Sequence, residues 1–294
     1  MEINSLAVGQ QFAPVPLIID PRKITNFAAA VGDINPRYLD DLRDGPLAVH
    51  PSFSAVIAWQ VVSLLRSQAD FPIPVDIFNY FVHFDETINF QRQLHSGEEI
   101  IVTPELAAIL PHRAGTLIVL QLTVTTADGV NIYVHQMTGL LRGVKCRDDG
   151  RGAENLILTA SVTREQPLEW STEIIIAPEA PYLYDGCAGI VAPIHTSPAA
   201  ARRLGLPGII LQGTATLARA VTGLIDHEAG GDPQQVAVLA GRFSDFVFPG
   251  TTIRLNLLER VASDRQIELF FTVHNHLNNP AVSRGYLKLN RPGV

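Results

Sequence analysis

The chain has 294 residues, of which 47% are hydrophobic and 17% charged, and its formal net charge is −7. It is long enough for one large core or two cores of about 130–150 residues each, and the absence of a Lys and Arg cluster argues against nucleic-acid binding. Two cysteines, Cys146 and Cys187, are too few for a disulfide framework or a zinc knuckle. The sequence shows neither a signal-peptide pattern nor an apolar run of about 18 residues, which predicts a cytoplasmic protein without a membrane span.

In chain order, the first half begins with an early segment and a turn-rich stretch, and then enters an apolar run at 52–67. Apolar residues lie on nearly every face of this run, which predicts a buried helix. Strands without intervening helices are predicted after it, at 78–92, 98–110, 115–127 and 130–142. The pair Asp128-Gly129 is a strong hairpin signal between the last two of these strands.

The second half repeats the same order of elements after a polar segment. A helix is predicted at 213–226, and strands are predicted near 236–247, 251–261, 265–275 and 281–290. When the octet GDINPRYL (32–39) is aligned with GIVAPIHT (189–196), glycine meets glycine and proline meets proline. Further along, Phe90 matches Phe243, Gly97 matches Gly250 and Ile100 matches Ile253, while the offset drifts only from 157 to 153. Such self-similarity predicts a duplicated unit, with an N-terminal unit at 1–148, a linker at 149–165 and a C-terminal unit at 166–294.

One helix followed by antiparallel strands indicates an α+β layer in which the sheet wraps the helix. Present twice, this layer resembles the double hot-dog fold, in which two antiparallel sheets, each around a buried central helix, join into a pseudo-dimer. The two octets resemble the hydration motif of the MaoC-like, (R)-specific enoyl-CoA hydratase family. That motif reads Gly-Asp-x-Asn-Pro-x-His, and a His-Gly pair opens the central helix after it.

Each half keeps a different part of this motif. The second half keeps Pro193, His195 and Gly213, and has Ile190, Ala192 and Gln212 where the family has Asp, Asn and His. The first half keeps Asp33, Asn35 and Pro36, has Tyr38 in place of the histidine, and has His50 followed by Pro51 at the His-Gly position. The acid and the histidine of the motif therefore never occur in the same half.

The resemblance implies a hydro-lyase that adds water reversibly to a 2-enoyl-CoA, with an acyl-CoA or acyl-carrier thioester as substrate and no further cofactor. His195 would act as general base and acid near neutral pH, and the backbone at Gly213 would approach the thioester and stabilise the enolate oxygen. The other catalytic candidates are Gln212, Asp33 and Tyr38, and the substrate-binding candidates are Asn35, His50, Pro193 and Thr214. The C-terminal unit is expected to hold the active site, and the protein is expected to form a homodimer.

The residues alone leave structural alternatives open. A lone histidine is often structural, and GDINP is also a turn and helix-end signal, with Gly as a cap and Asp and Asn as local backbone acceptors. Asp185 lies ten residues before His195 and Glu173 lies further off, so either acid would have to reach the site through the fold. One site shared by Asp33 and His195 is disfavoured, because equivalent positions of a pseudo-twofold pair belong to separate pockets.

Two other functions compete with hydration. A thioesterase on the same fold would tolerate the missing acid at position 190, and a non-catalytic acyl-thioester-binding subunit would explain why both octets depart from the motif. The segment HNHLNN (274–279) offers two histidines on one face of a strand, but the sequence shows no third ligand. No metal site is therefore predicted.

Overall fold

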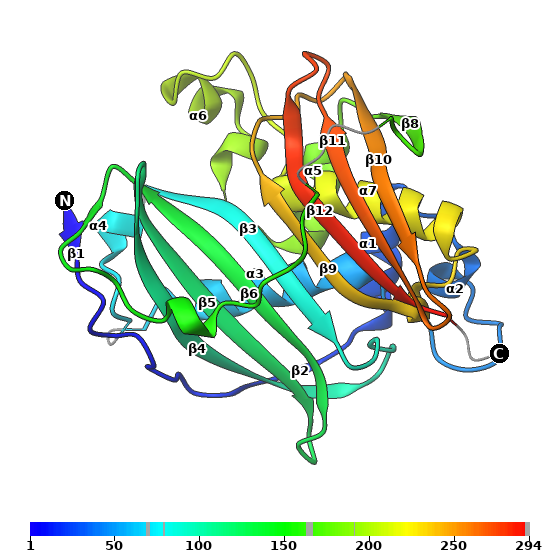
Figure 1. Cartoon of the computed structure of the whole chain (residues 1–294), viewed down its shortest axis with the longest axis horizontal. Coiled ribbons are helices and arrows are strands. Elements are labelled where there is room, and N and C mark those ends of the chain that lie inside the picture. Colours follow the sequence, from blue (N-terminus) through cyan, green and yellow to red (C-terminus); the bar gives the residue numbers. More distant parts are fainter. Residues whose placement is uncertain (69–70, 79, 163–166, 191, 292–294) are drawn as a thin grey trace.

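The computed structural model describes residues 1–68, 71–78, 80–162, 167–190 and 192–291. Within these residues the main feature is a ten-stranded sheet in the order β2-β4-β5-β6-β3-β9-β12-β11-β10-β8, and all its neighbouring strands are antiparallel. Helices α3 and α7 cover one face of this sheet (Figure 1). The described chain thus has the predicted α+β layers, one helix against each half of the sheet.

The strands of the N-terminal half are β2 (Val15–Ile18), β3 (Phe81–Phe90), β4 (Glu99–His112), β5 (Gly115–Thr126) and β6 (Asn131–Arg142). Those of the C-terminal half are β8 (Trp170–Ile175), β9 (Val236–Phe243), β10 (Thr252–Ala262), β11 (Gln266–His274) and β12 (Pro280–Asn290). A small parallel pair is formed by β1 (Glu2–Ile3) and β7 (Lys145–Cys146). The helices are α1 (Pro21–Val31), α2 (Pro36–Leu39), α3 (Ser54–Leu65), α4 (Val75–Phe78), α5 (Ala180–Ala188), α6 (Pro198–Arg203) and α7 (Gly213–Glu228). Single 3-10 turns are η1 (Pro51–Phe53), η2 (Ala153–Asn155), η3 (Pro193–His195) and η4 (Pro233–Gln235).

The eight long strands and the two central helices confirm the predictions from the sequence. Among the elements that the structure adds are the short edge strands β2 and β8 and the helices α1 and α5, which the sequence left as early segments. One detail differs from the prediction of two sheets. Strand β3 pairs with β9, so the two five-stranded halves form a single continuous sheet.

The duplication predicted from the sequence is visible in the equivalent turns. Phe90 ends β3 and Phe243 ends β9. In the turns that follow, Gly97 has φ 82° and Gly250 has φ 78°, a left-handed conformation that glycine adopts without strain. Equivalent glycines therefore close equivalent turns in the two halves.

The core lies between the two central helices and the sheet. On α3, Val61 and Leu65 are buried, and on α7 so are Leu217 and Val221. Burying each such side chain stabilises the fold by about 1.5–3 kcal/mol. The sequence predicted that helix α3 is buried on all sides. This prediction is wrong at Leu64, which is 44% exposed.

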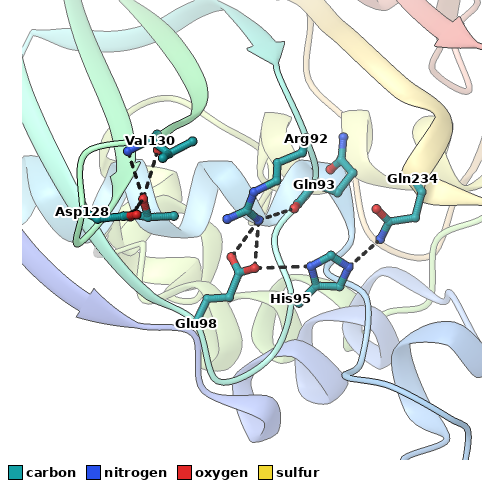
Figure 2. Close-up of polar contacts among 8 residues, drawn as sticks. Arg92, Gln93, His95, Glu98, Asp128, Val130 and Gln234 are labelled. Carbon is teal, nitrogen blue, oxygen red and sulfur yellow. Dashed lines mark hydrogen bonds and ion pairs between the residues drawn. The ribbon is translucent and has the colours of Figure 1, made fainter.

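The loop after β3 joins the two halves on the rim of the sheet (Figure 2). Nδ1 of His95 lies 3.3 Å from Glu98 Oε1, and its Nε2 lies 3.2 Å from Nε2 of Gln234 in the C-terminal half. Gln93 donates a 2.6 Å hydrogen bond to the carbonyl of Val236. Figure 2 also shows the predicted hairpin at Asp128, whose carboxylate accepts a hydrogen bond from Thr126.

The segment after β7 crosses the face of the sheet opposite α3 (Figure 1). Asn155 is fixed there, donating to the Ala107 carbonyl at 2.9 Å and accepting from Gln136 at 2.7 Å. Residues 163–165 of the predicted linker lie outside the described residues, and the unit boundaries stay a prediction. No helix in the described ranges is long and apolar enough to cross a membrane.

Candidate active site

The first octet follows helix α1 and forms a closed set of hydrogen bonds. Gly32 ends α1 with φ 78°, as the helix-end reading of GDINP predicted. Asp33 comes next and is buried; its Oδ1 accepts a 3.0 Å bond from the Asn35 N–H. Asn35 in turn caps α2 through the Arg37 N–H at 3.0 Å and donates a 2.7 Å bond to the carbonyl of Gly231 in the other half.

A chain of three side chains links Asp33 to His50 through the C-terminal half. Nδ1 of His50 accepts a bond from the Ser52 N–H at 3.1 Å, so the neutral ring carries its proton on Nε2. That Nε2 lies 3.2 Å from Thr222 Oγ1, which itself donates to Asp33 Oδ2 at 3.1 Å. The polar atoms of these three side chains therefore all have partners. We call this group the Asp33–Thr222–His50 lock.

Burial makes the lock a poor acid-base site. It raises the pKa of Asp33, against the opposing effects of the Asn35 N–H and Thr222, and it lowers the pKa of His50 to about 3. Tyr38 packs its ring on His50 with centroids 5.6 Å apart. Burial also raises the pKa of Tyr38 well above its usual value, so the phenol stays neutral. The structure thus brings Asp33, Asn35, Tyr38 and His50 together in a sealed cluster.

The second octet follows helix α5, which ends at Gly189 with φ 62°. Ile190, at the position of the motif acid, is 4% exposed and belongs to the core; Val191 lies outside the described residues. Pro193 begins the turn η3, and His195 ends it. This turn places the imidazole of His195 against the chain that leads into α7.

His195 is held in one orientation by the backbone. Its Nδ1 lies 2.9 Å from the carbonyl oxygen of Ile210, which can only accept, so Nδ1 carries the proton and Nε2 is the unprotonated nitrogen, the one that can act as a base. Burial lowers the pKa of His195, while the Ile210 carbonyl and the charge of Asp185 raise it. The imidazole is therefore neutral at pH 7, as a general base requires.

Asp185 supplies a carboxylate to the second loop from helix α5. Burial raises the pKa of Asp185, and His195 and the Gln212 side chain both lower it by favouring the ionised form. Gln212 is 1% exposed and donates a 3.1 Å bond to the Pro181 carbonyl. Among the described residues, neither Oδ1 of Asp185 nor Oε1 of Gln212, both buried, has a hydrogen-bond partner. These two oxygens can hold a water molecule or a polar group of a substrate.

Helix α7 begins beside this pair and leaves its first N–H groups open. Gln212 is the N-cap residue, but no side chain within the described ranges caps the helix. The unpaired N–H groups and the helix dipole make this end attractive to negative charge. A Cβ at Gly213 would lie 2.7 Å from the ring of Phe243, so only glycine fits here without a shift. Thr214 is less available, because its Oγ1 accepts a 3.0 Å bond from Tyr184.

The two loops are thus separate and unlike. Among the described residues, the hydrogen-bond and ion-pair partners of Asp33 differ from the groups that act on His195. His195, Gln212 and Gly213 come together at the second loop. The sequence named Asp185 as a candidate but did not show whether its side chain reaches the second loop. Its place ten residues before His195 was the signal that the sequence offered.

The fold and its sequence matches indicate the class of protein. Residues 6–135 match the family model described as FAS1-like, dehydratase domain region, and residues 160–276 match the MaoC like domain. The chain therefore carries a FAS1-like dehydratase region in its N-terminal half and a MaoC-like domain in its C-terminal half.

Individual proteins show the same likeness. The chain is 24% identical over 257 residues to a Mycobacterium tuberculosis protein named enoyl-CoA hydratase ChsH3, covering 86% of this chain and 87% of that protein. A crystal structure of a MaoC-like dehydratase from Phytophthora capsici superposes with a TM-score of 0.84 at 18% identity, covering 98% and 97% of the two chains. A Mycobacterium tuberculosis protein described as having a double hot-dog fold gives a TM-score of 0.62 at 14% identity, with 97% and 96% covered. These two structures support the fold.

Proposed function

We propose that this protein is a hydratase that adds water reversibly to a 2-enoyl thioester of CoA or of an acyl carrier, using the site at the start of α7. The observation that carries the proposal is the gathering of His195, Asp185 and Gln212 beside the uncapped N-terminus of that helix. The relative named enoyl-CoA hydratase supports the same reaction class.

In this mechanism the attacking water lies beside Gln212 and donates one hydrogen bond to the carboxylate of Asp185 and the other to His195 Nε2, which removes that second proton as the oxygen bonds to Cβ of the substrate. The electron pair of the Cα–Cβ double bond moves onto the thioester carbonyl as an enolate. The N–H groups at Gly213 stabilise that negative charge. The imidazolium then returns its proton to Cα, so that one water is added and the enzyme is restored.

The test is an assay of water addition to 2-enoyl-CoA substrates of increasing chain length, read by loss of the enoyl-thioester absorbance. Hydration is expected with the natural protein and not with His195→Asn. Release of free CoA with the double bond intact would point to a thioesterase. Binding of acyl-CoA without turnover would point to a non-catalytic subunit.

The proposal includes a reaction without a cofactor, carried by side chains and the helix start alone. Activity is expected to survive dialysis against EDTA, and its loss would contradict this part.

We also propose a cytoplasmic homodimer. The exposed Ile18 on β2 and Ile175 on β8, at the two outer edges of the sheet, support a contact between copies. Light scattering of the purified protein and cell fractionation test these two points.

A further inference from the structure

A second group of polar side chains, two buried and two half-buried, lies between the sheet and helix α3, where β3 meets β9. We call it the seam cluster; its members are Glu86 and His83 on β3, His135 on β6 and Trp59 on α3. Glu86 Oε2 lies 3.4 Å from His135 Nε2 and 3.8 Å from His83 Nε2. The ring of His83 packs edge-on against Trp59, with centroids 5.7 Å apart. The side chains of Glu86 and His135 are fully buried.

The seam cluster holds more hydrogen-bonding capacity than the protein uses. Burial favours the neutral acid, but His135 and His83 outweigh it and lower the pKa of Glu86, so its carboxylate is ionised. Within the part of the chain that the structure describes, Oε1 of Glu86 and Nε1 of Trp59 have no hydrogen-bond partner, and Oε2 of Glu86 has only its ion-pair contacts with His135 and His83. Leaving such atoms unpaired costs about 1–3 kcal/mol each, which favours a role in binding over one in stability.

The seam cluster lies next to the candidate active site. The ring of Phe243 touches the position of a Cβ at Gly213 and also packs on His83, with centroids 4.7 Å apart. One aromatic ring therefore separates the start of α7 from the cluster. Burial raises the pKa of Tyr184, and the charge of Glu86 adds to this effect; the Tyr184 hydroxyl donates to Thr214 on the first turn of α7. Phe243 and Tyr184 therefore connect the start of α7, where the thioester carbonyl is proposed to bind, with the seam cluster.

We propose that the seam cluster selects substrates whose acyl chain carries a hydroxyl group beyond Cβ. This inference rests on the proposed function, since it assumes that an acyl thioester binds at the start of α7. A hydroxyl can accept from the indole N–H of Trp59, which only donates, and can donate to the carboxylate of Glu86, which only accepts. An alkyl chain would leave these groups unpaired, and a carboxylate would be repelled by Glu86.

The first experiment measures binding without turnover. Isothermal titration compares saturated acyl-CoAs of one chain length: the plain alkyl chain, isomers with a hydroxyl at successive carbons beyond Cβ, and the chain ending in a carboxylate. One hydroxyl isomer is expected to bind about tenfold more tightly than the alkyl chain, the value of one good hydrogen bond, and the carboxylate more weakly. Equal affinities for all would overturn the inference and leave the proposed function standing.

The second experiment assigns the preference to the cluster. Trp59→Phe removes the N–H and is expected to abolish the tenfold preference for the hydroxyl isomer. Trp170→Phe is the matched control. Trp170 lies on the edge strand β8, and its N–H donates to Glu228 at 2.8 Å. The Trp170 variant should therefore keep the preference for the hydroxyl isomer. Glu86→Gln should bind the carboxylate chain as well as the alkyl chain. A preference that survives Trp59→Phe, or that Trp170→Phe removes equally, would overturn the inference. Hydroxyl-selective binding without hydration of any enoyl-CoA would instead overturn the proposed function.

Discussion

Thr222, on helix α7 of the C-terminal half, donates a 3.1 Å hydrogen bond to Asp33 in the N-terminal half and lies 3.2 Å from His50 Nε2. This contact separates the roles of the two octets. The acid that the first octet keeps is used in a buried bond between the halves. The histidine that the second octet keeps has its Nδ1 proton fixed by the Ile210 carbonyl and is influenced by the charge of Asp185.

Thr222→Val tests the structural role of the Asp33–Thr222–His50 lock. The substitution leaves Asp33 Oδ2 and the His50 N–H buried without their partner, and each unpaired group costs about 1–3 kcal/mol. We expect the free energy of unfolding in urea to fall by about 2–4 kcal/mol, and kcat of the folded protein to stay unchanged. Thr222→Ser keeps the hydroxyl and should lose much less stability. A large loss of kcat at unchanged stability would assign chemistry to the first octet instead.

His195→Asn separates catalysis from folding at the second octet. The Asn amide can still donate to the Ile210 carbonyl, so the thermal midpoint should change little, but the base is gone. We expect kcat/KM for enoyl-CoA hydration to fall about 10²–10⁴-fold. His274, in the β11–β12 hairpin, offers the control His274→Asn, which should retain full activity. Turnover at the natural rate in the His195 variant would remove this residue from the mechanism.

Asp185→Asn changes the pH dependence as well as the rate. Burial holds the pKa of His195 below its usual 6.5, and the charge of Asp185 partly offsets that effect. Hydration needs neutral His195, so activity is lost as the pH falls through the pKa of His195. Without the Asp185 charge this pKa drops further, and the acid limb of kcat/KM should shift to lower pH while kcat falls about tenfold or more. An acid limb that stays in place would show that Asp185 does not act on His195.

The fold was predictable because each half carries its own local signals. Alternating strands, the Asp128-Gly129 turn and two apolar helices fixed the order of elements, and matched glycines revealed the duplication. The edge strands β2 and β8 were missed because they are only four and six residues long and pair with partners far along the chain. The single sheet depends on the β3–β9 pairing, which no local pattern encodes.

The site was only partly predictable, for a related reason. The motif register identified His195 and Gly213, but Asp185 reaches the loop from the preceding helix. The lock needs Thr222, 189 residues from Asp33. Glu86 carried an overlooked signal, since it has the same parity on β3 as the buried Ile88 and Phe90. An acidic residue on the inner face of a strand indicates a buried charge that needs partners.

Gly213→Ala tests how closely the start of α7 must be packed. A Cβ at this position would lie 2.7 Å from Cδ1 of Phe243, so either the ring or the helix start must move. Displacement of the N–H groups by a fraction of an ångström misaligns them with the enolate oxygen, and we expect kcat to fall about a hundredfold with a lower thermal midpoint. Phe243→Ala in the same chain removes the Cγ, Cδ1 and Cε1 atoms that the added methyl group would meet and should restore kcat in large part. If the double variant is no better than Gly213→Ala, the loss comes from the methyl group blocking the substrate rather than from packing against Phe243.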